Sequence, residues 1–211
     1  LPTYDVFDEH RYFKSGENST KLNLFGYEIG ITICEDAWHD HYVTGNQRHN
    51  YNPISEYNSC DIVVNLSASP FKVNKFQNRE YRFANHADNT NSVYVFANQV
   101  GGNDDILFDG TSFIIDSEGN TIYRAPFGRP HLCKYTLDSN SQNSYEIPSE
   151  TEQIRTILKR GIKDYIQKTG FEEVVIGLSG GIDSTVTANL AVDAIGKDNV
   201  YGVTLPSSVS S

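Results

Sequence analysis

The alternation of apolar and polar residues divides the chain into two parts. In the first part, short apolar runs rich in β-branched residues predict strands at 24–34, 61–66, 93–98, 111–116 and 121–124 and a helix over about 75–89. Residues 117–120, Ser-Glu-Gly-Asn, predict a hairpin turn between the last two strands. In the second part, helical spacing predicts an amphipathic helix over 152–168, followed by a strand, a helix and a strand at 174–178, 185–195 and 199–205.

A polar stretch separates the two parts. From residue 138 the sequence reads Asp-Ser-Asn-Ser-Gln-Asn-Ser-Tyr-Glu-Ile-Pro-Ser-Glu-Thr, which contains almost no apolar residues and indicates a linker or a long surface crossing. We therefore predict a first domain at 1–138, a linker at 139–151 and a second domain at 152–211. Both domains are expected to be of the α/β class.

The loop at 179–184, Ser-Gly-Gly-Ile-Asp-Ser, has a pattern typical of phosphate binding. It follows an apolar run and precedes a helix, so backbone N–H groups and a helix N-terminus would face an anion. Adjacent glycines allow a close approach of the backbone, and two serines add hydroxyl donors. The loop contains no Lys and is not of the Walker type. The alternative is a tight turn with a Ser or Asp helix cap.

Cys34 is the second candidate for chemistry. Isoleucines alternate through 29–33 like one face of a strand, so Cys34 is expected at or just past the strand end, where reactive groups are often held beside loops. The neighbouring Glu35 and Asp36 would raise the pKa of the thiol, so a nucleophilic role requires a cation and a base from elsewhere. The alternative is a buried, inert thiol.

Composition narrows the class of protein. A net charge of −10 argues against a nucleic-acid partner, and no apolar run is long enough to span a membrane. Three cysteines without close spacing favour a reducing cytoplasm over disulfides or zinc. The chain contains no Met and opens on Leu-Pro-Thr-Tyr, so we expect it to be part of a longer protein, with no signal peptide in its polar first ten residues.

The remaining candidates have simpler interpretations. The histidines at 39, 41 and 49 lie in a polar segment that is predicted to be a loop, without the spacing of a zinc site. Trp38 is expected to be a packing residue. Cys60 and Cys133 have no activating neighbours in the sequence and are expected to be structural.

Several motifs taken together resemble one family. They are CEDxW at 34–38, NLSASPF at 65–71, KxxxR at 75–79, NQVGGNDD at 98–105 and FDGTS at 108–112. These motifs resemble the glutamine amidotransferase part of the nitrilase superfamily, in the version that is fused to NAD synthetase. The loop at 179–184 is similar to the pyrophosphate loop of N-type ATP pyrophosphatases, the class to which the synthetase part belongs. The resemblance covers nearly the whole chain and identifies it as part of a glutamine-dependent NAD synthetase.

The resemblance implies a fold and a glutaminase site. The fold would be the later part of a nitrilase-like α-β-β-α sandwich, followed by the start of a doubly wound parallel sheet. Cys34 would attack the side-chain amide of glutamine, releasing ammonia and leaving a thioester. Glu9 would orient groups or handle protons, its alternative being a solvated acid. The triad Lys and Glu of the family would precede Leu1. The residues expected to line the glutamine pocket are Tyr4, Phe7, Glu35, Ser69 and Lys75.

The resemblance also implies the chemistry of the second domain. Mg²⁺ would neutralise charge on ATP with help from Asp183, and the carboxylate of deamido-NAD would be adenylated and then amidated to NAD. Family members form homo-oligomers when full length. With the composition arguments above, we expect a cytoplasmic protein with neither nucleic-acid nor membrane partners. The alternatives are another ATP-pyrophosphatase amidotransferase and a catalytically incomplete nucleotide-binding fragment. The residues expected to bind ATP are Ser179, Gly180, Gly181, Asp183 and Ser184.

Overall fold

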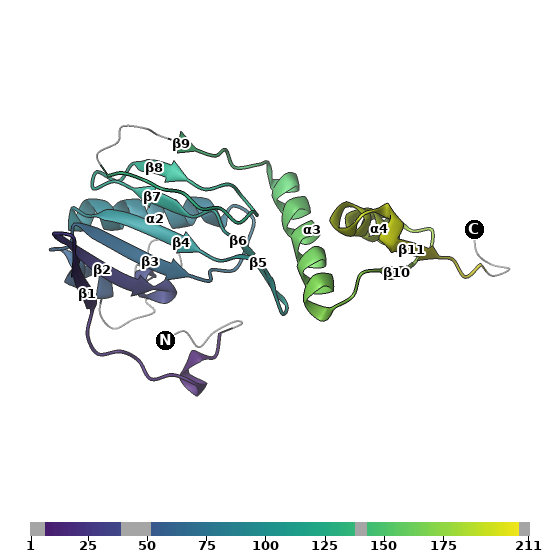
Figure 1. The fold of residues 1–211 in the computed structure, drawn as a ribbon, viewed down its shortest axis with the longest axis horizontal. Helices are drawn as coiled ribbons and strands as arrows, with labels where there is room; N and C mark the ends of the chain where they lie inside the picture. The colour runs from purple at the N-terminus through teal and green to yellow at the C-terminus, as the bar shows by residue number, and fades with distance from the viewer. Residues whose placement is uncertain (1–6, 39–51, 138–142, 207–211) are drawn as a thin grey trace.

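The structure is a computed structural model that describes residues 7–38, 52–137 and 143–206. Its first part is a seven-stranded sheet with α2 against one face, and its second part is a small β-α-β unit reached through the long helix α3 (Figure 1). The elements are η1 (Glu9–Arg11), β1 (Thr20–Leu24), β2 (Tyr27–Ile33), η2 (Cys34–Ala37), η3 (Pro53–Tyr57), β3 (Ile62–Ser67), α2 (Lys75–Thr90), β4 (Val93–Asn98), β5 (Val100–Asn103), β6 (Ile106–Asp109), β7 (Phe113–Ile115), β8 (Thr121–Arg124), β9 (Asn143–Ser144), α3 (Glu150–Thr169), β10 (Val174–Gly177), α4 (Ile182–Ile195), η4 (Lys197–Asn199) and β11 (Val200–Val203).

The large sheet is mixed. Its strand order is β1-β2-β3-β4-β7-β8-β9. The strands β2, β3 and β4 are parallel to one another, the pairs β1–β2, β4–β7 and β7–β8 are antiparallel, and β9 is parallel to β8. In register, Ile31 lies opposite Val64, and Val64 lies opposite Val95. Because β2 and β3 are parallel neighbours, their carboxyl ends meet at one edge. This edge carries Cys34 and the residues that follow Ser67.

The main core lies between the sheet and α2. Phe83 of α2 is fully buried, and its ring contacts those of Tyr94, Phe96 and Phe113 at centroid distances of 5.9, 5.1 and 5.5 Å. Each fully buried aromatic side chain contributes about 1.5–3 kcal/mol through area removed from water. The core therefore holds α2, and the residues at its N-terminus, in a fixed position above the sheet.

The two faces of the sheet differ in packing. Thr32 is buried on the face covered by α2 and η3, and a Cβ at Gly30 on this face would overlap the ring of Tyr57. The alternating isoleucines lie on the opposite face, where Ile33 is 65% exposed and Leu66 is 50% exposed. The alternation at 29–33 was a correct sign of a strand, but it marks the less buried face.

Two hairpins were missing from the sequence prediction. The predicted strand 24–34 is in fact the turn and second strand of the hairpin β1–β2, because Phe25 and Gly26 have φ of 54° and 86° and Leu24 pairs with Tyr27. A two-residue turn with both φ values positive matches the twist of a hairpin, and Phe is not a usual signal for it. The hairpin β5–β6 was also missed. Its turn includes Asp104 at a φ of 49°.

The other predicted elements are confirmed within a few residues. α2, β4 and β8 match closely, β7 is shorter than the predicted strand 111–116, and Asp116 accepts hydrogen bonds from Glu118 and Asn120 in the predicted hairpin turn. Residues 143–151, the described part of the polar stretch, contain β9, which pairs with β8, and the first residues of α3.

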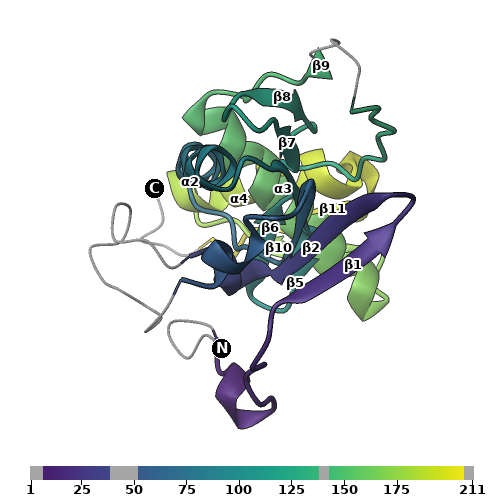
Figure 2. The same ribbon diagram turned by 90° about the vertical axis from the view of Figure 1, so that its left-hand side faces the viewer.

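The second part starts with α3. The hydroxyl of Ser149 accepts a hydrogen bond from the Glu152 N–H at the start of α3, and Gly170 ends the helix at a φ of 78°. β10 and β11 are parallel neighbours joined through α4, so the predicted β-α-β unit and the α/β class are confirmed. Figure 1 shows α3 between this unit and the hairpin β5–β6, and Figure 2 shows the same elements along the long axis of the molecule. Within the described ranges, none of the helices has the length and apolar character needed to cross a membrane.

Candidate functional site

Cys34 lies directly after β2, as predicted, in a strained backbone conformation. Its φ is 37°, a region that non-glycine residues rarely adopt and that often marks functional positions. The strand stops there because the Asp36 carboxylate accepts a hydrogen bond from the Ile33 N–H at 2.8 Å, which closes the short helix η2. The turn fixes the backbone that carries the thiol.

The surroundings of Cys34 change its acidity in two directions. Burial raises the pKa of the Cys34 thiol above its usual value, and the charge of Glu35 raises it further. Hydrogen bonds with the Ser67 hydroxyl and the Ala68 backbone, together with the charge of Lys75, lower the pKa but do not reverse the shift. Within the described residues, the thiol is therefore protonated at neutral pH. The sequence argument that Cys34 requires further activation is consistent with this direction.

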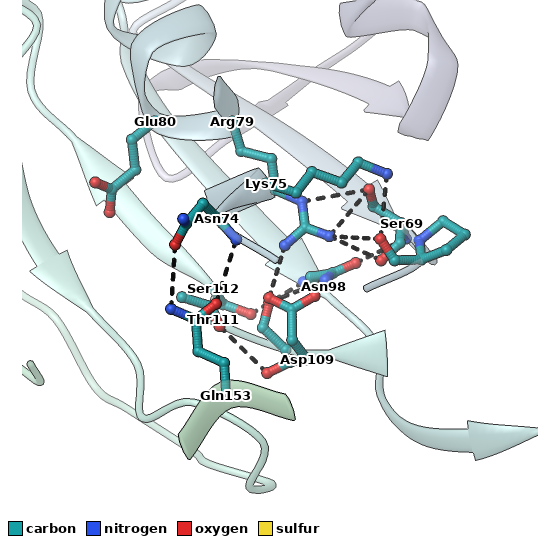
Figure 3. Close-up of polar contacts among 12 residues, drawn as sticks. Ser69, Asn74, Lys75, Arg79, Glu80, Asn98, Asp109, Thr111, Ser112 and Gln153 are labelled. Carbon is teal, nitrogen blue, oxygen red and sulfur yellow. Dashed lines mark hydrogen bonds and ion pairs between the residues drawn. The ribbon is translucent and has the colours of Figure 1, made fainter. Parts of the chain in front are cut away.

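Ser69 is held by a buried polar network (Figure 3). Its N–H donates to the Asn98 side chain at 2.9 Å, and its carbonyl accepts from Arg79 at 2.9 Å. Arg79 is fully buried and forms an ion pair with Asp109 at 2.7 Å. A buried ion pair depends on close geometry, because each charge has lost its water. The network therefore fixes the loop that follows β3.

Lys75 extends from the first residue of α2 towards the same loop. Its ammonium group donates to the Pro70 carbonyl at 3.2 Å and lies 5.5 Å from the centre of the Trp38 ring. Trp38 is buried and also stacks under Arg82, 4.3 Å from the ring centre. Trp38 therefore has the packing role that the sequence predicted, and its ring contacts two cations, of which Lys75 also acts on the thiol.

The other residues predicted for this site differ in how near they lie to Cys34. Glu35 is buried next to Cys34, and Phe7 is half-buried. Glu9 lies in η1, which is separate from the sheet in both ribbon views (Figures 1 and 2). One oxygen of its carboxylate is buried without a hydrogen-bond partner among the described residues. Tyr4 lies outside the described residues, as do the histidines at 39, 41 and 49. The structure thus groups Cys34, Glu35, Ser69 and Lys75, and leaves Glu9 apart.

The sequence motifs contained several of these partners without indicating their roles. Ser67, Asn98 and Asp109 each lie at or just after a strand end within a quoted motif, and this position could have marked them as candidates. Arg79 could have been found as a cation on the α2 face that also carries Phe83. All three cysteines are free. Cys60 is buried, as expected of a structural thiol, whereas Cys133 is exposed.

The loop at 179–184 connects β10 to the first turn of α4. The hydroxyl groups of Ser179 and Ser184 lie 3.3 Å apart, and Ser184 also accepts from the Ser179 N–H at 3.3 Å. Gly180 has a φ of 80°, and a Cβ there would meet no atom within 4 Å. The loop is exposed, so its backbone and hydroxyl donors are accessible to a ligand. All the atoms of this arrangement come from one short segment.

The donor set of this loop fits the phosphates of a nucleotide. Two hydroxyls, a glycine backbone free of side chains and the N-terminus of a 14-residue helix favour an anion. Asp183 is in the first turn of α4 and is the carboxylate available for a phosphate-bound Mg²⁺. The described residues contain no group of three or more His, Cys, Asp and Glu side chains arranged to hold a metal alone. A metal here would therefore depend on ligands from the nucleotide.

Two family models match different parts of this chain. The carbon-nitrogen hydrolase family model matches residues 1–146, and the NAD synthase family model matches residues 154–211. The glutamine-dependent NAD(+) synthetase of Synechocystis sp. is 42% identical over 219 residues, covering 100% of this chain and 39% of the relative. The corresponding protein of Aquifex aeolicus is 35% identical, covering 100% of this chain and 42% of the relative.

Solved structures give the same result. The glutamine-dependent NAD+ synthetase of Acinetobacter baumannii, solved with adenosine diphosphate, superposes with a TM-score of 0.89 at 34% identity, over 100% of this chain and 39% of that chain. The synthetase of Cytophaga hutchinsonii, at a TM-score of 0.67 and 22% identity, covers 92% of this chain and 32% of that chain and shares the fold. The chain thus spans about two fifths of the curated relatives that it matches. Since the first family model matches well over half of the residues, this chain belongs to the carbon-nitrogen hydrolase family.

Proposed function

We propose that this chain is a segment of a glutamine-dependent NAD synthetase, with the later part of the glutaminase domain at 1–138, a linker at 139–151 and the start of the synthetase domain at 152–211. The observation that carries the proposal is the 42% identity to one such enzyme across the whole chain, through both parts and the polar stretch between them. Two unrelated sites in the order of one family are a much stronger indication than either site alone.

In the glutaminase domain, Cys34 is the nucleophile. Its sulfur attacks the side-chain carbonyl carbon of glutamine, the C–N bond breaks, and ammonia leaves with a proton from the thiol while a thioester remains. Water then adds to the thioester and releases glutamate, returning the proton to sulfur. The Ser67 hydroxyl and the Ala68 N–H hold the sulfur in place, which is supported by their hydrogen bonds to Cys34. Because the pKa of Cys34 is raised, the step also requires a base and a cation, which the family resemblance attributes to a Glu and a Lys.

The glutamine pocket is assigned to Tyr4, Phe7, Glu35, Ser69 and Lys75. The assignment of Ser69 and Lys75 is supported by their position at the loop after β3. Ser69 lies in this loop, where Arg79 binds its carbonyl, and Lys75 donates a hydrogen bond to the next residue, Pro70. Glu9 would handle protons or orient groups near the nucleophile.

In the synthetase domain, the loop at 179–184 binds ATP. Ser179 and Ser184 donate hydrogen bonds from their hydroxyl groups to the β- and γ-phosphates, and Gly180 and Gly181 let the backbone approach these phosphates. Asp183 would help to hold Mg²⁺, which would neutralise phosphate charge. The acceptor is deamido-NAD, whose carboxylate attacks ATP to form an adenylate and release pyrophosphate. Ammonia from glutamine then displaces AMP and gives NAD. The full-length protein is cytoplasmic and homo-oligomeric, with neither nucleic acid nor membrane among its partners.

The test is an assay of the full-length protein with glutamine, ATP, Mg²⁺ and deamido-NAD. NAD, glutamate, AMP and pyrophosphate should form in equal amounts, and Asp183→Asn should reduce NAD formation while glutamine hydrolysis continues. Glutamine hydrolysis without any ATP-dependent NAD formation would contradict the proposal, and so would amidation of a different carboxylate. The 211 residues alone should release no glutamate, because the thiol is not activated within the described part of the chain.

A further inference from the structure

The N-terminal turn of α3 reaches the loop that leads to Lys75. Gln153 of α3 is 2% exposed, and its carboxamide pairs with Asn74, the residue before α2 (Figure 3). The Asn74 N–H donates to Gln153 Oε1 at 3.3 Å, and Gln153 Nε2 donates to Asn74 Oδ1 at 3.3 Å. The Asn74 carboxamide also donates to Glu150. Two residues 79 positions apart in sequence therefore form a reciprocal amide pair.

The amide pair stabilises the backbone conformation of Asn74, which has a positive φ of 60°. Asparagine tolerates this left-handed conformation better than most residues, but the conformation is usually stabilised by hydrogen bonds. A second backbone–side-chain contact further along α3 adds to the rigidity: the Gly102 N–H donates to Asp164 at 2.8 Å. α3 is thus attached to the hydrolase part near both ends, and its first turn contacts the residue that precedes α2.

From Asn74, a continuous series of contacts leads to the thiol. The next residue, Lys75, donates to the Pro70 carbonyl at 3.2 Å, and Arg79 holds the carbonyls of Ser69 and Pro70 at 2.9 and 3.2 Å. The same loop supplies the hydrogen bonds with Cys34. A displacement of Asn74 would therefore move Lys75 and the loop that contacts the nucleophile.

We propose that Gln153 is a positioning residue for the glutaminase site: through Asn74 it holds Lys75 and the loop at 67–70 in the geometry that binds the substrate amide and orients Cys34. The inference rests on the proposed function and adds to it a contribution from the helix that leads into the synthetase part. Neither family model includes Gln153, which lies between the two matched ranges. On this proposal, the position of the loop at 67–70 depends on α3, which lies outside the residues that the carbon-nitrogen hydrolase model matches.

The test compares two variants with one control in the full-length protein. Gln153→Leu keeps the size of the side chain but removes both hydrogen bonds to Asn74. Asn74→Gly removes the other half of the pair and keeps a residue that adopts positive φ without strain. Arg155→Ala is the control, since Arg155 lies on the same helix but pairs with Asp193 of α4 at 2.6 Å on the surface. Each protein is assayed for the kcat and KM of glutamine hydrolysis, for NAD formation from free ammonia, and for the rate of Cys34 alkylation by iodoacetamide.

We expect both variants of the pair to raise the KM for glutamine about tenfold, because small displacements of binding groups have large effects. Alkylation of Cys34 should be slower by about twofold or more, because its hydrogen-bond donors have moved. Ammonia-dependent NAD formation should stay at the wild-type level, and Arg155→Ala should change neither KM nor alkylation.

Two results would overturn the inference. One is an unchanged KM and alkylation rate in folded Gln153→Leu and Asn74→Gly. The other is a parallel loss of glutamine- and ammonia-dependent activity in both, which would mean that the pair only stabilises the protein. If the wild-type protein does not hydrolyse glutamine at all, the proposed function fails, and the alkylation rates alone decide whether Gln153 positions Cys34.

Discussion

The end of the sheet that carries Cys34 and the loop at 179–184, for which we propose phosphate binding and which we call the phosphate loop, are built in opposite ways. Cys34 depends on residues from β2, the loop after β3, and α2, and a fully buried ion pair between Arg79 and Asp109 secures that loop. The phosphate loop is exposed, and its hydrogen bonds join residues at most five positions apart. The first site is therefore a product of the tertiary fold, while the second is mostly a product of local sequence. Substitutions at the first site should therefore reduce the stability of the fold, whereas substitutions at the second should mainly affect ligand binding.

The largest effect is expected at the buried ion pair. Arg79→Met would leave the Asp109 carboxylate buried without its partner, and we expect the free energy of unfolding to fall by about 3–5 kcal/mol. Urea unfolding of the chain, followed by the fluorescence of Trp38, its single tryptophan, measures this change. Arg155→Ala removes an exposed ion pair and should cost less than about 1 kcal/mol. A loss below 1 kcal/mol for Arg79→Met would mean that the pair is not what secures the loop.

At the phosphate loop, a substitution should affect binding more than stability. Gly180→Ala places a Cβ in open space but at a φ of 80°, which costs about 1–2 kcal/mol in the observed backbone conformation. We expect about a tenfold weaker use of ATP by the full-length protein, with unchanged hydrolysis of glutamine. Gly177→Ala, which has open space and no positive φ, is the matched control. Equal effects of the two substitutions would show that the backbone conformation of Gly180 is not required.

The junction between the two regions should respond to packing. A Cβ at Gly161 of α3 would lie 2.6 Å from Leu107 Cδ2, so Gly161→Ala should destabilise the chain by about 1 kcal/mol despite the better helix propensity of Ala. Adding Leu107→Ala should relieve the overlap, so that the double variant loses less stability than the sum of the single variants. Additive losses in urea unfolding would indicate that the two residues do not contact each other.

The smallest effect concerns pH. Because the pKa of Cys34 is raised in the folded chain, alkylation of Cys34 should reach half of its maximal rate above the ordinary thiol pKa, and faster reaction at neutral pH would contradict this. The stability that this shift contributes is complete below the unfolded pKa and is lost as pH rises through the folded pKa. Cys34→Ala should therefore flatten the alkaline fall in stability.

The same comparison explains how much could be predicted from the sequence. The strand–loop–helix connection at 174–195 could be predicted because strand, glycines, serines and helix follow one another directly, and α2 and β4 could be predicted from their periodicity. Phosphate binding by the loop stays a prediction. The hairpin β1–β2 was missed because Phe25 adopts a positive φ that its side chain does not favour in general. The pairs Arg79–Asp109 and Asn74–Gln153 were missed because they join residues 30 and 79 positions apart. Such contacts are set by the tertiary fold and leave no local pattern.

The most direct test of the account is the source of nitrogen used by the full-length Cys34→Ala protein. If the two regions are separate sites of one enzyme, this variant should form no NAD from glutamine and should form NAD from free ammonia at the wild-type rate. Undiminished NAD formation from glutamine would contradict the role of Cys34. Loss of the ammonia-dependent reaction, in a protein that unfolds at the wild-type temperature, would contradict the independence of the phosphate loop.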